Sequence, residues 1–119
     1  MPIGTGITCI ALRAEKAQLQ FSIEPQSNES AESYSLEIGK QKITIQAQDQ
    51  AGLFYAFITL NQFIEDALDQ GLPLPLVQLQ DAPKIAFRPI QIDIKHHLEK
   101  KEYYYDLIDE LAQLKINGM

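Results

Sequence analysis

The periodicity of the apolar residues changes at Asp49, and this change does most to limit how the chain can fold. Before it, residues 34–38 and 43–47 alternate apolar and polar side chains and are joined by a short link that contains Gly39. Such a pair of alternating runs is typical of an antiparallel β-hairpin. After it, apolar residues recur about every 3.6 positions over residues 53–64, which indicates an amphipathic helix packed against the sheet. The chain is therefore expected to be an α+β protein.

Local signals indicate where this helix begins and ends. Asp49 suits the N-cap position, because its carboxylate can accept a hydrogen bond from an otherwise unpaired helix N–H. Gly71, followed by the prolines of residues 73–75, ends the helix. Gly52 costs about 1 kcal/mol relative to alanine inside a helix. Its presence predicts a close approach between the helix and a neighbouring strand.

Two further strands are expected in the same domain. Residues 19–23 (LQFSI) alternate apolar and polar side chains, and residues 76–80 (LVQLQ) resemble a strand that follows the helix. The turn at residues 81–83 is the predicted domain boundary.

A second, shorter β/α segment follows that turn. Residues 90–94 (IQIDI) alternate and predict a strand, and residues 100–115 carry apolar side chains at helical spacing. Residues 117–118 (Asn-Gly) fit either a helix C-cap or the short loop into a second strand. One strand and one helix form the opening unit of a repeating β/α fold, so the chain is expected to be a fragment. Residues 85–119 are expected to self-associate, because an unpaired apolar strand invites pairing with another chain.

Composition excludes several classes of function. The net charge is −6 and the pI about 4.8, which argues against a nucleic-acid-binding surface or a polybasic membrane contact. No run approaches about 18 consecutive apolar residues. The first residues lack a charged segment followed by an apolar run, so no secretory signal is expected, and the location of the intact protein stays open. The single cysteine, Cys9, cannot form an internal disulfide and is expected to be a small core residue.

The sequence contains no pattern that predicts a cofactor or a metal. A glycine-rich phosphate loop, a Ser-His-Asp order and a CxxC motif are all missing from the 119 residues. His96 and His97 are adjacent, and neighbouring side chains on an extended chain point to opposite faces. We therefore predict neither a metal site nor a cofactor.

Two blocks of sequence carry ordered sets of short motifs. The first is ESYSLEIGKQKITIQAQDQAGLFYAFITLNQF, residues 32–63; the second joins Asp81-Ala82-Pro83 to FRPIQID and to a helix that ends in LAQLKIN. In their order and spacing these blocks resemble the β-N-acetylhexosaminidases of glycoside hydrolase family 20. The first block is similar to the family's small domain before its barrel, and the second to the family's first barrel strand and helix. Together they cover nearly all of residues 19–117.

The resemblance implies a fold and an activity. Residues 1–82 would form a two-layer α+β accessory domain, with helices packed on one face of a mixed or antiparallel sheet. Residues 83–119 would form the first strand and helix of a truncated (β/α)8 TIM barrel, a domain that needs roughly 250 residues. The family hydrolyses terminal N-acetylhexosaminides with the sugar's own acetamido group as nucleophile, assisted by an Asp-Glu pair on a later barrel strand. No residue of this chain matches that pair, so the chain itself is expected to be inactive and structural, with carbohydrate as the partner of the intact enzyme.

The resemblance also implies two substrate-binding residues. Arg88 aligns with the family's arginine before the first barrel strand, which binds hydroxyls of the terminal sugar through several fixed donors. Without the family, an arginine at that place is a surface or linker residue. Asp93 lies at the C-terminal end of the strand, where barrel enzymes keep their functional groups, and either lines the pocket or bonds neighbouring loops. Pro89 replaces the family's usual glycine and residues 95–97 replace its Arg-His-aromatic, which leaves substrate preference open.

Two alternatives of other classes remain. A stand-alone interaction or carbohydrate-binding module would need a solvent-compatible surface on residues 85–119, which the apolar Ile90, Ile92 and Ile94 argue against. A zinc peptidase remnant would need an HExxH motif, which the sequence lacks.

Overall fold

The computed structural model describes residues 18–95 and 97–119 of the chain. It divides into two compact units, Met1–Pro83 and Lys84–Met119. The described part of the first unit contains a sheet and a helix, and that of the second contains one helix preceded by extended chain. Cys9 and His96 lie outside the described residues.

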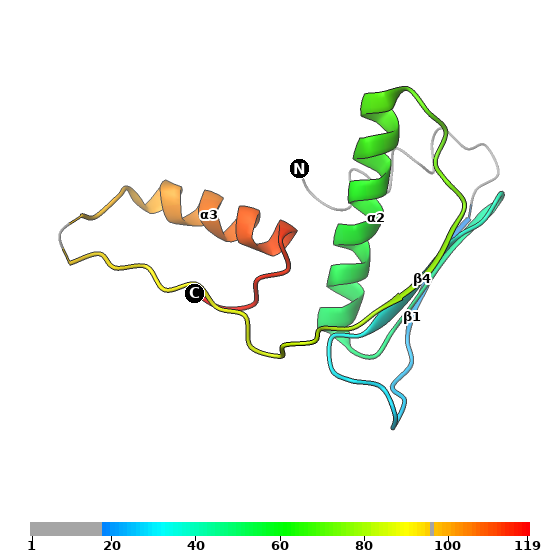
Figure 1. Ribbon diagram of the computed structural model, residues 1–119, viewed down its shortest axis with the longest axis horizontal. Coiled ribbons are helices and arrows are strands. Elements are labelled where there is room, and N and C mark those ends of the chain that lie inside the picture. Colours follow the sequence, from blue (N-terminus) through cyan, green and yellow to red (C-terminus); the bar gives the residue numbers. More distant parts are fainter. Residues whose placement is uncertain (1–17, 96) are drawn as a thin grey trace. The chain divides into compact units, whose positions relative to one another are not determined.

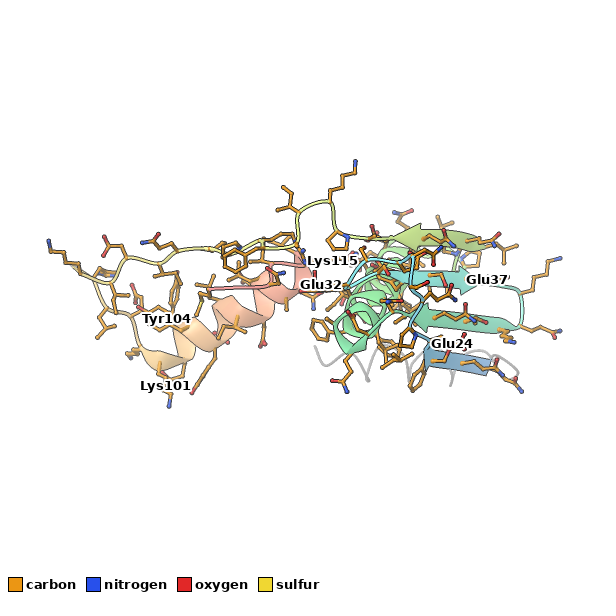
Figure 2. All side chains as sticks on the ribbon, turned by 90° about the horizontal axis from the view of Figure 1, so that it is seen from below. Glu24, Glu32, Glu37, Lys101, Tyr104 and Lys115 are labelled. Carbon is orange, nitrogen blue, oxygen red and sulfur yellow. The ribbon has the colours of Figure 1, made fainter. Side chains whose placement is uncertain are left out.

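The sheet of the first unit has four strands in the order β1-β3-β2-β4, which Figure 2 shows from one edge to the other. The strands are β1 (Gln18–Ile23), β2 (Tyr34–Ile38), β3 (Lys42–Ala47) and β4 (Val77–Asp81). The predicted hairpin is confirmed: β2 and β3 are antiparallel, with Leu36 opposite Ile45. β4 pairs antiparallel with β2, whereas β1 runs parallel to β3, so the sheet is mixed.

The helix α2 (Gln50–Gln70) lies on one face of this sheet (Figure 1). Strand alternation places the apolar side chains of β2 and β3 toward α2, because successive strand residues point to opposite faces. The core is made by side chains from the two middle strands and the helix: Tyr34, Leu36, Ile38, Ile43, Ile45, Ala47, Tyr55, Ala56, Leu60 and Ile64. The opposite strand positions carry polar residues, such as Thr44 and Gln46 of β3 and Ser35 of β2. The predicted α+β layering is therefore confirmed for this unit.

Both predicted ends of α2 are confirmed. Asp49 is the N-cap, and its Oδ1 accepts a hydrogen bond from Gly52 N at 2.7 Å. Its second oxygen, Oδ2, accepts from Glu32 N at 3.0 Å, so one carboxylate joins the helix to the loop before β2. Gly71 ends the helix in the left-handed conformation with φ 65°, which glycine adopts without steric cost.

The predicted close approach at Gly52 is also confirmed. A Cβ atom on Gly52 would lie 2.4 Å from the carbonyl oxygen of Ser33, which immediately precedes β2. Ser33 is buried, and its carbonyl accepts a hydrogen bond from Gln48 N at 3.0 Å. Glycine is therefore required at this position by the spacing between helix and strand.

In the second unit the expected helix is confirmed as α3 (Lys101–Gln113), but the expected strand at residues 90–94 is wrong. This segment is extended without a ladder; its neighbourhood holds one isolated parallel bridge, between Pro89 and Gly118. A strand needs a continuous row of hydrogen bonds to a neighbour. In the described residues, only the short segment after α3 provides such bonds. In Figure 1 the extended segment runs alongside α3, and the red C-terminal residues return beside it.

The helix α3 ends two residues earlier than the Asn-Gly pair suggested. Lys115 takes the left-handed conformation with φ 59° and donates its N–H to Ala112 O, while Ile116 N donates to Leu111 O. These two bonds form the Schellman ending of a helix, with lysine at the position where glycine is usual. Of the expected apolar stripe, Leu111 is buried whereas Leu114 is 72% exposed.

Candidate functional site

Arg88 lies in the extended segment of the second unit, and its guanidinium is held by main-chain oxygens. Nε donates to Lys115 O at 2.8 Å, just beyond the end of α3. Nη1 donates to Ile85 O at 2.7 Å and to Ala86 O at 3.3 Å. Lys115 adopts the left-handed conformation that follows the end of α3, and its carbonyl oxygen is the one that accepts from Arg88 Nε. The side chain is therefore oriented by the chain on both sides of α3.

Asn117, two residues after Lys115 in the loop that follows α3, contacts the backbone around Arg88. Its Oδ1 accepts from Arg88 N at 2.7 Å, and its Nδ2 donates to Ala86 O at 2.6 Å. Its own N–H donates to Arg88 O at 3.2 Å. The sequence predicts Asn117 only in a helix cap or a short loop and does not predict these contacts. The signal that could have revealed it is an amide side chain, both donor and acceptor, in the loop that returns to a strand.

Asp93 is exposed, and its Oδ1 accepts a hydrogen bond from Lys95 N at 2.9 Å. This bond closes a local turn of the kind that aspartate commonly makes with a backbone N–H two residues on. His97 Nε2 contacts Glu99 Oε1, and both side chains are open to solvent. Within the described residues no three His, Cys, Asp or Glu side chains form a group that could hold a metal ion.

The first unit has a polar concave surface on the sheet and the loop before β2. Its lining is made of carboxylates, amides, hydroxyls and small residues: Glu24, Gln26, Glu29, Ser33, Tyr34, Ser35, Gln46, Ala47, Gln48, Gln80, Asp81 and Ala82. Several of these groups already bond one another. Gln48 accepts from Gln26 N at 2.7 Å and donates to Gln26 O at 2.9 Å, and Glu24 accepts at 2.9 Å from Ser22, which lies outside the lining. These bonds brace the rim of the surface.

At the end of β4 the hydroxyl of Tyr34 joins the sheet to α2. It donates to Asp81 Oδ2 at 2.9 Å and shares a 2.6 Å hydrogen bond with Thr59 Oγ1. Tyr34 is buried, and Thr59 and Asp81 supply the polar partners that a buried tyrosine hydroxyl needs. The arrangement orders the chain immediately before the boundary at Pro83.

No helix within residues 18–95 or 97–119 combines the length and the apolar character that crossing a bilayer requires.

Comparison with known proteins identifies the family. The sequence model of glycosyl hydrolase family 20, domain 2, matches residues 5–82. The chain is 31% identical over 86 residues to a beta-N-acetylhexosaminidase of Cellulomonas fimi, a match that covers 72% of this chain and 17% of the relative. It is 24% identical over 114 residues to beta-hexosaminidase B of Pseudoalteromonas piscicida, covering 95% of this chain and 14% of that relative.

Solved structures agree with this assignment. A glycoside hydrolase family 20 beta-N-acetylglucosaminidase superposes with a TM-score of 0.74 at 31% identity, over 96% of this chain and 24% of that one. The family 20 exo beta-N-acetylglucosaminidase of Vibrio harveyi, solved with N-acetylglucosamine, shares the fold with a TM-score of 0.73 at 20% identity, over 97% of this chain and 19% of that one. This chain spans about a fifth of the length of these relatives. The match across residues 5–82 shows that the chain belongs to glycosyl hydrolase family 20, of which it carries domain 2.

Proposed function

We propose that the protein containing this chain removes terminal N-acetylhexosamine residues from carbohydrates by a retaining, substrate-assisted mechanism. The observation that carries the proposal is the family match over residues 5–82, together with relatives whose names are those of hexosaminidases. In such a mechanism the acetamido carbonyl oxygen of the substrate is the nucleophile, in place of an enzyme carboxylate. An Asp-Glu pair orients that acetamido group and protonates the leaving oxygen.

In this proposal the two parts of the chain have different roles. Residues 1–82 form the accessory domain, which braces the catalytic domain without taking part in the chemistry. Residues 83–119 form the first strand and helix of a (β/α)8 barrel. The division between Pro83 and Lys84 supports this boundary.

The return of the chain after α3 supports the barrel assignment. Ile90 N donates to Gly118 O at 3.1 Å, and Asn117 N donates to Arg88 O at 3.2 Å, which makes the two segments parallel. A helix between two parallel segments is the repeating step of a β/α barrel. A barrel would also extend the single bridge into a ladder, because each strand then has a neighbour on both sides.

Arg88 and Asp93 are the proposed substrate-binding residues. Arg88 offers charged donors to sugar hydroxyls, and its backbone hydrogen bonds restrict the rotamers of its long side chain before substrate binds. Asp93 lies near the carboxyl end of the extended segment, the end at which barrel enzymes bind substrate. Neither residue supplies the acid or the base of the reaction.

The alternative of a self-sufficient interaction or carbohydrate-binding module is less well supported. Phe87, Leu98 and Leu114 in the second unit are each more than 70% exposed. Several highly exposed large apolar side chains on one small unit favour a surface that other protein covers. A finished module would instead present polar residues at these positions.

The test compares the 119-residue chain with the longer protein on a chromogenic N-acetylglucosaminide. We expect the longer protein to be active and the mass-verified 119-residue chain to release no chromophore above background. In the longer protein, Arg88→Ala should lower kcat/KM about tenfold to a hundredfold, the range expected for losing a charged hydrogen bond. The matched control is Arg13→Ala, because Arg13 is the only other arginine among the 119 residues. Turnover by the short chain would contradict its structural role, and no turnover by the longer protein would contradict the activity.

A further inference from the structure

We infer that Asn117 is the positioning residue for Arg88. Its side-chain amide bonds to the main chain on the N-terminal side of Arg88, at Ala86 O, and to Arg88 N itself, at 2.6 and 2.7 Å. Its N–H bonds to Arg88 O at 3.2 Å. Three bonds from one residue thus determine where the backbone of Arg88 lies. This inference rests on the proposed role of Arg88 in binding the sugar.

The position of Asn117 also determines the place of the carbonyl that receives the guanidinium. Lys115 and Asn117 belong to the same short loop after α3, with only Ile116 between them. The Schellman bonds of Lys115 and Ile116 attach this loop to the last turn of α3. When Asn117 bonds to the backbone at Arg88, Lys115 O is brought within 2.8 Å of Arg88 Nε. The amide and the carbonyl therefore hold one arginine by its backbone and its side chain together.

Pro89, the residue after Arg88, increases the importance of the hydrogen bonds from Asn117. Pro89 has no N–H to donate, and it restricts Arg88 to an extended conformation. The Asn117 amide then supplies a partner for Arg88 N, which a continuous ladder would otherwise have to provide. An aspartate could accept from Arg88 N but could not donate to Ala86 O. Asparagine is suited to this place because it does both.

The inference is tested by NMR on the 119-residue chain. Its two arginines, Arg13 and Arg88, give at most two Nε–H signals, and Arg13→Lys assigns them. We expect Arg88 Nε–H to exchange with water more slowly than free arginine, by about tenfold for one hydrogen bond. Asn117→Ala should remove most of this protection, Asn117→Asp should remove part of it, and Asn28→Ala in an exposed loop should leave it unchanged. Unchanged protection in Asn117→Ala, with the amides of α3 still protected, would overturn the inference.

A second measurement covers the case in which Asn117→Ala loses α3. In the unsubstituted chain, a scalar coupling across the hydrogen bond should connect Asn117 Nδ2 to the carbonyl carbon of Ala86. A spectrum that shows the one-bond correlations of both groups but no such coupling would overturn the inference without any variant.

Kinetics on the longer protein separate this inference from the proposed function. Asn117→Ala should lower kcat/KM about tenfold when Arg88 is present and less than about twofold in an Arg88→Ala background, because both changes remove the same interaction. Equal losses in the two backgrounds would mean that Asn117 has a general structural role, which overturns the positioning. If the NMR protection depends on Asn117 but Arg88→Ala leaves kcat/KM unchanged, the positioning stands and the sugar-binding role of Arg88 fails.

Discussion

Replacing Gly52 with alanine should destabilise the first unit, although the same change usually stabilises a helix. The usual gain is up to about 1 kcal/mol, because alanine has less backbone freedom to lose on folding. Here the added Cβ would lie 2.4 Å from Ser33 O and 3.2 Å from Asp49 Oδ1. Since ordinary contacts begin near 3.4 Å, α2 and the loop before β2 would have to separate by about 1 Å.

That separation would affect two groups of bonds. Ser33 O accepts from Gln48 N, and the Asp49 carboxylate spans from Gly52 N to Glu32 N. Overpacking of this kind costs about 1–3 kcal/mol and a lost hydrogen bond about 1 kcal/mol more. After subtraction of the helical gain, the free energy of unfolding should fall by about 2 kcal/mol. For a domain of this size that corresponds to a drop of roughly 10 °C in Tm.

Urea unfolding followed by far-ultraviolet circular dichroism measures this change. Asp66→Ala on the exposed side of α2 is the control and should stay within about 0.5 kcal/mol of the unsubstituted chain. Gly71→Ala separates steric crowding from backbone strain, because Gly71 has φ 65° and no atom of the described residues lies within 4 Å of where its Cβ would be. It should cost about 1–2 kcal/mol from conformation alone. If Gly52→Ala proves neutral or stabilising, the close approach of α2 to Ser33 does not limit this position and the reasoning fails.

Three other predictions concern the N-cap of α2, the Tyr34 hydroxyl and the second unit. Asp49→Ala should cost about 2 kcal/mol and Asp49→Asn about half as much, because asparagine keeps an acceptor for Gly52 N but cannot also accept from Glu32 N; equal losses in urea unfolding would contradict the shared carboxylate. Tyr34→Phe should cost about 1–2 kcal/mol by thermal unfolding, since it removes the hydroxyl between Thr59 and Asp81, and no loss would mean that water replaces it. Residues 85–119 should drive concentration-dependent self-association in sedimentation velocity, and a monomer at all concentrations, with these residues resistant to proteolysis, would oppose this.

The fold of the first unit was largely predictable because its signals are local. Alternation in β2 and β3, the N-cap at Asp49 and the glycine at position 71 each depend on a few neighbouring residues. The parallel pairing of β1 with β3 was not predictable in this way, because alternation shows which face is buried but not which strand lies beside it. The strand expected at residues 90–94 failed for the same reason: its pattern suits a strand, but strand formation depends on a neighbour.

For the candidate site, the sequence and its family resemblance pointed to Arg88 and Asp93 as residue types suited to a sugar. What holds Arg88 could not be read from them, since Asn117 lies 29 positions away and its amide acts through contacts that only folding creates. The sequence by itself determined the α+β class and the ends of α2. The tertiary structure alone decided the strand order, the Ser33 carbonyl that α2 approaches at Gly52 and the bonds between Asn117 and Arg88. The physical reason is the sequence separation of the interacting residues. Backbone conformation and helix caps depend on residues a few positions apart, whereas strand pairing and long-range side-chain hydrogen bonds depend on which distant segments meet.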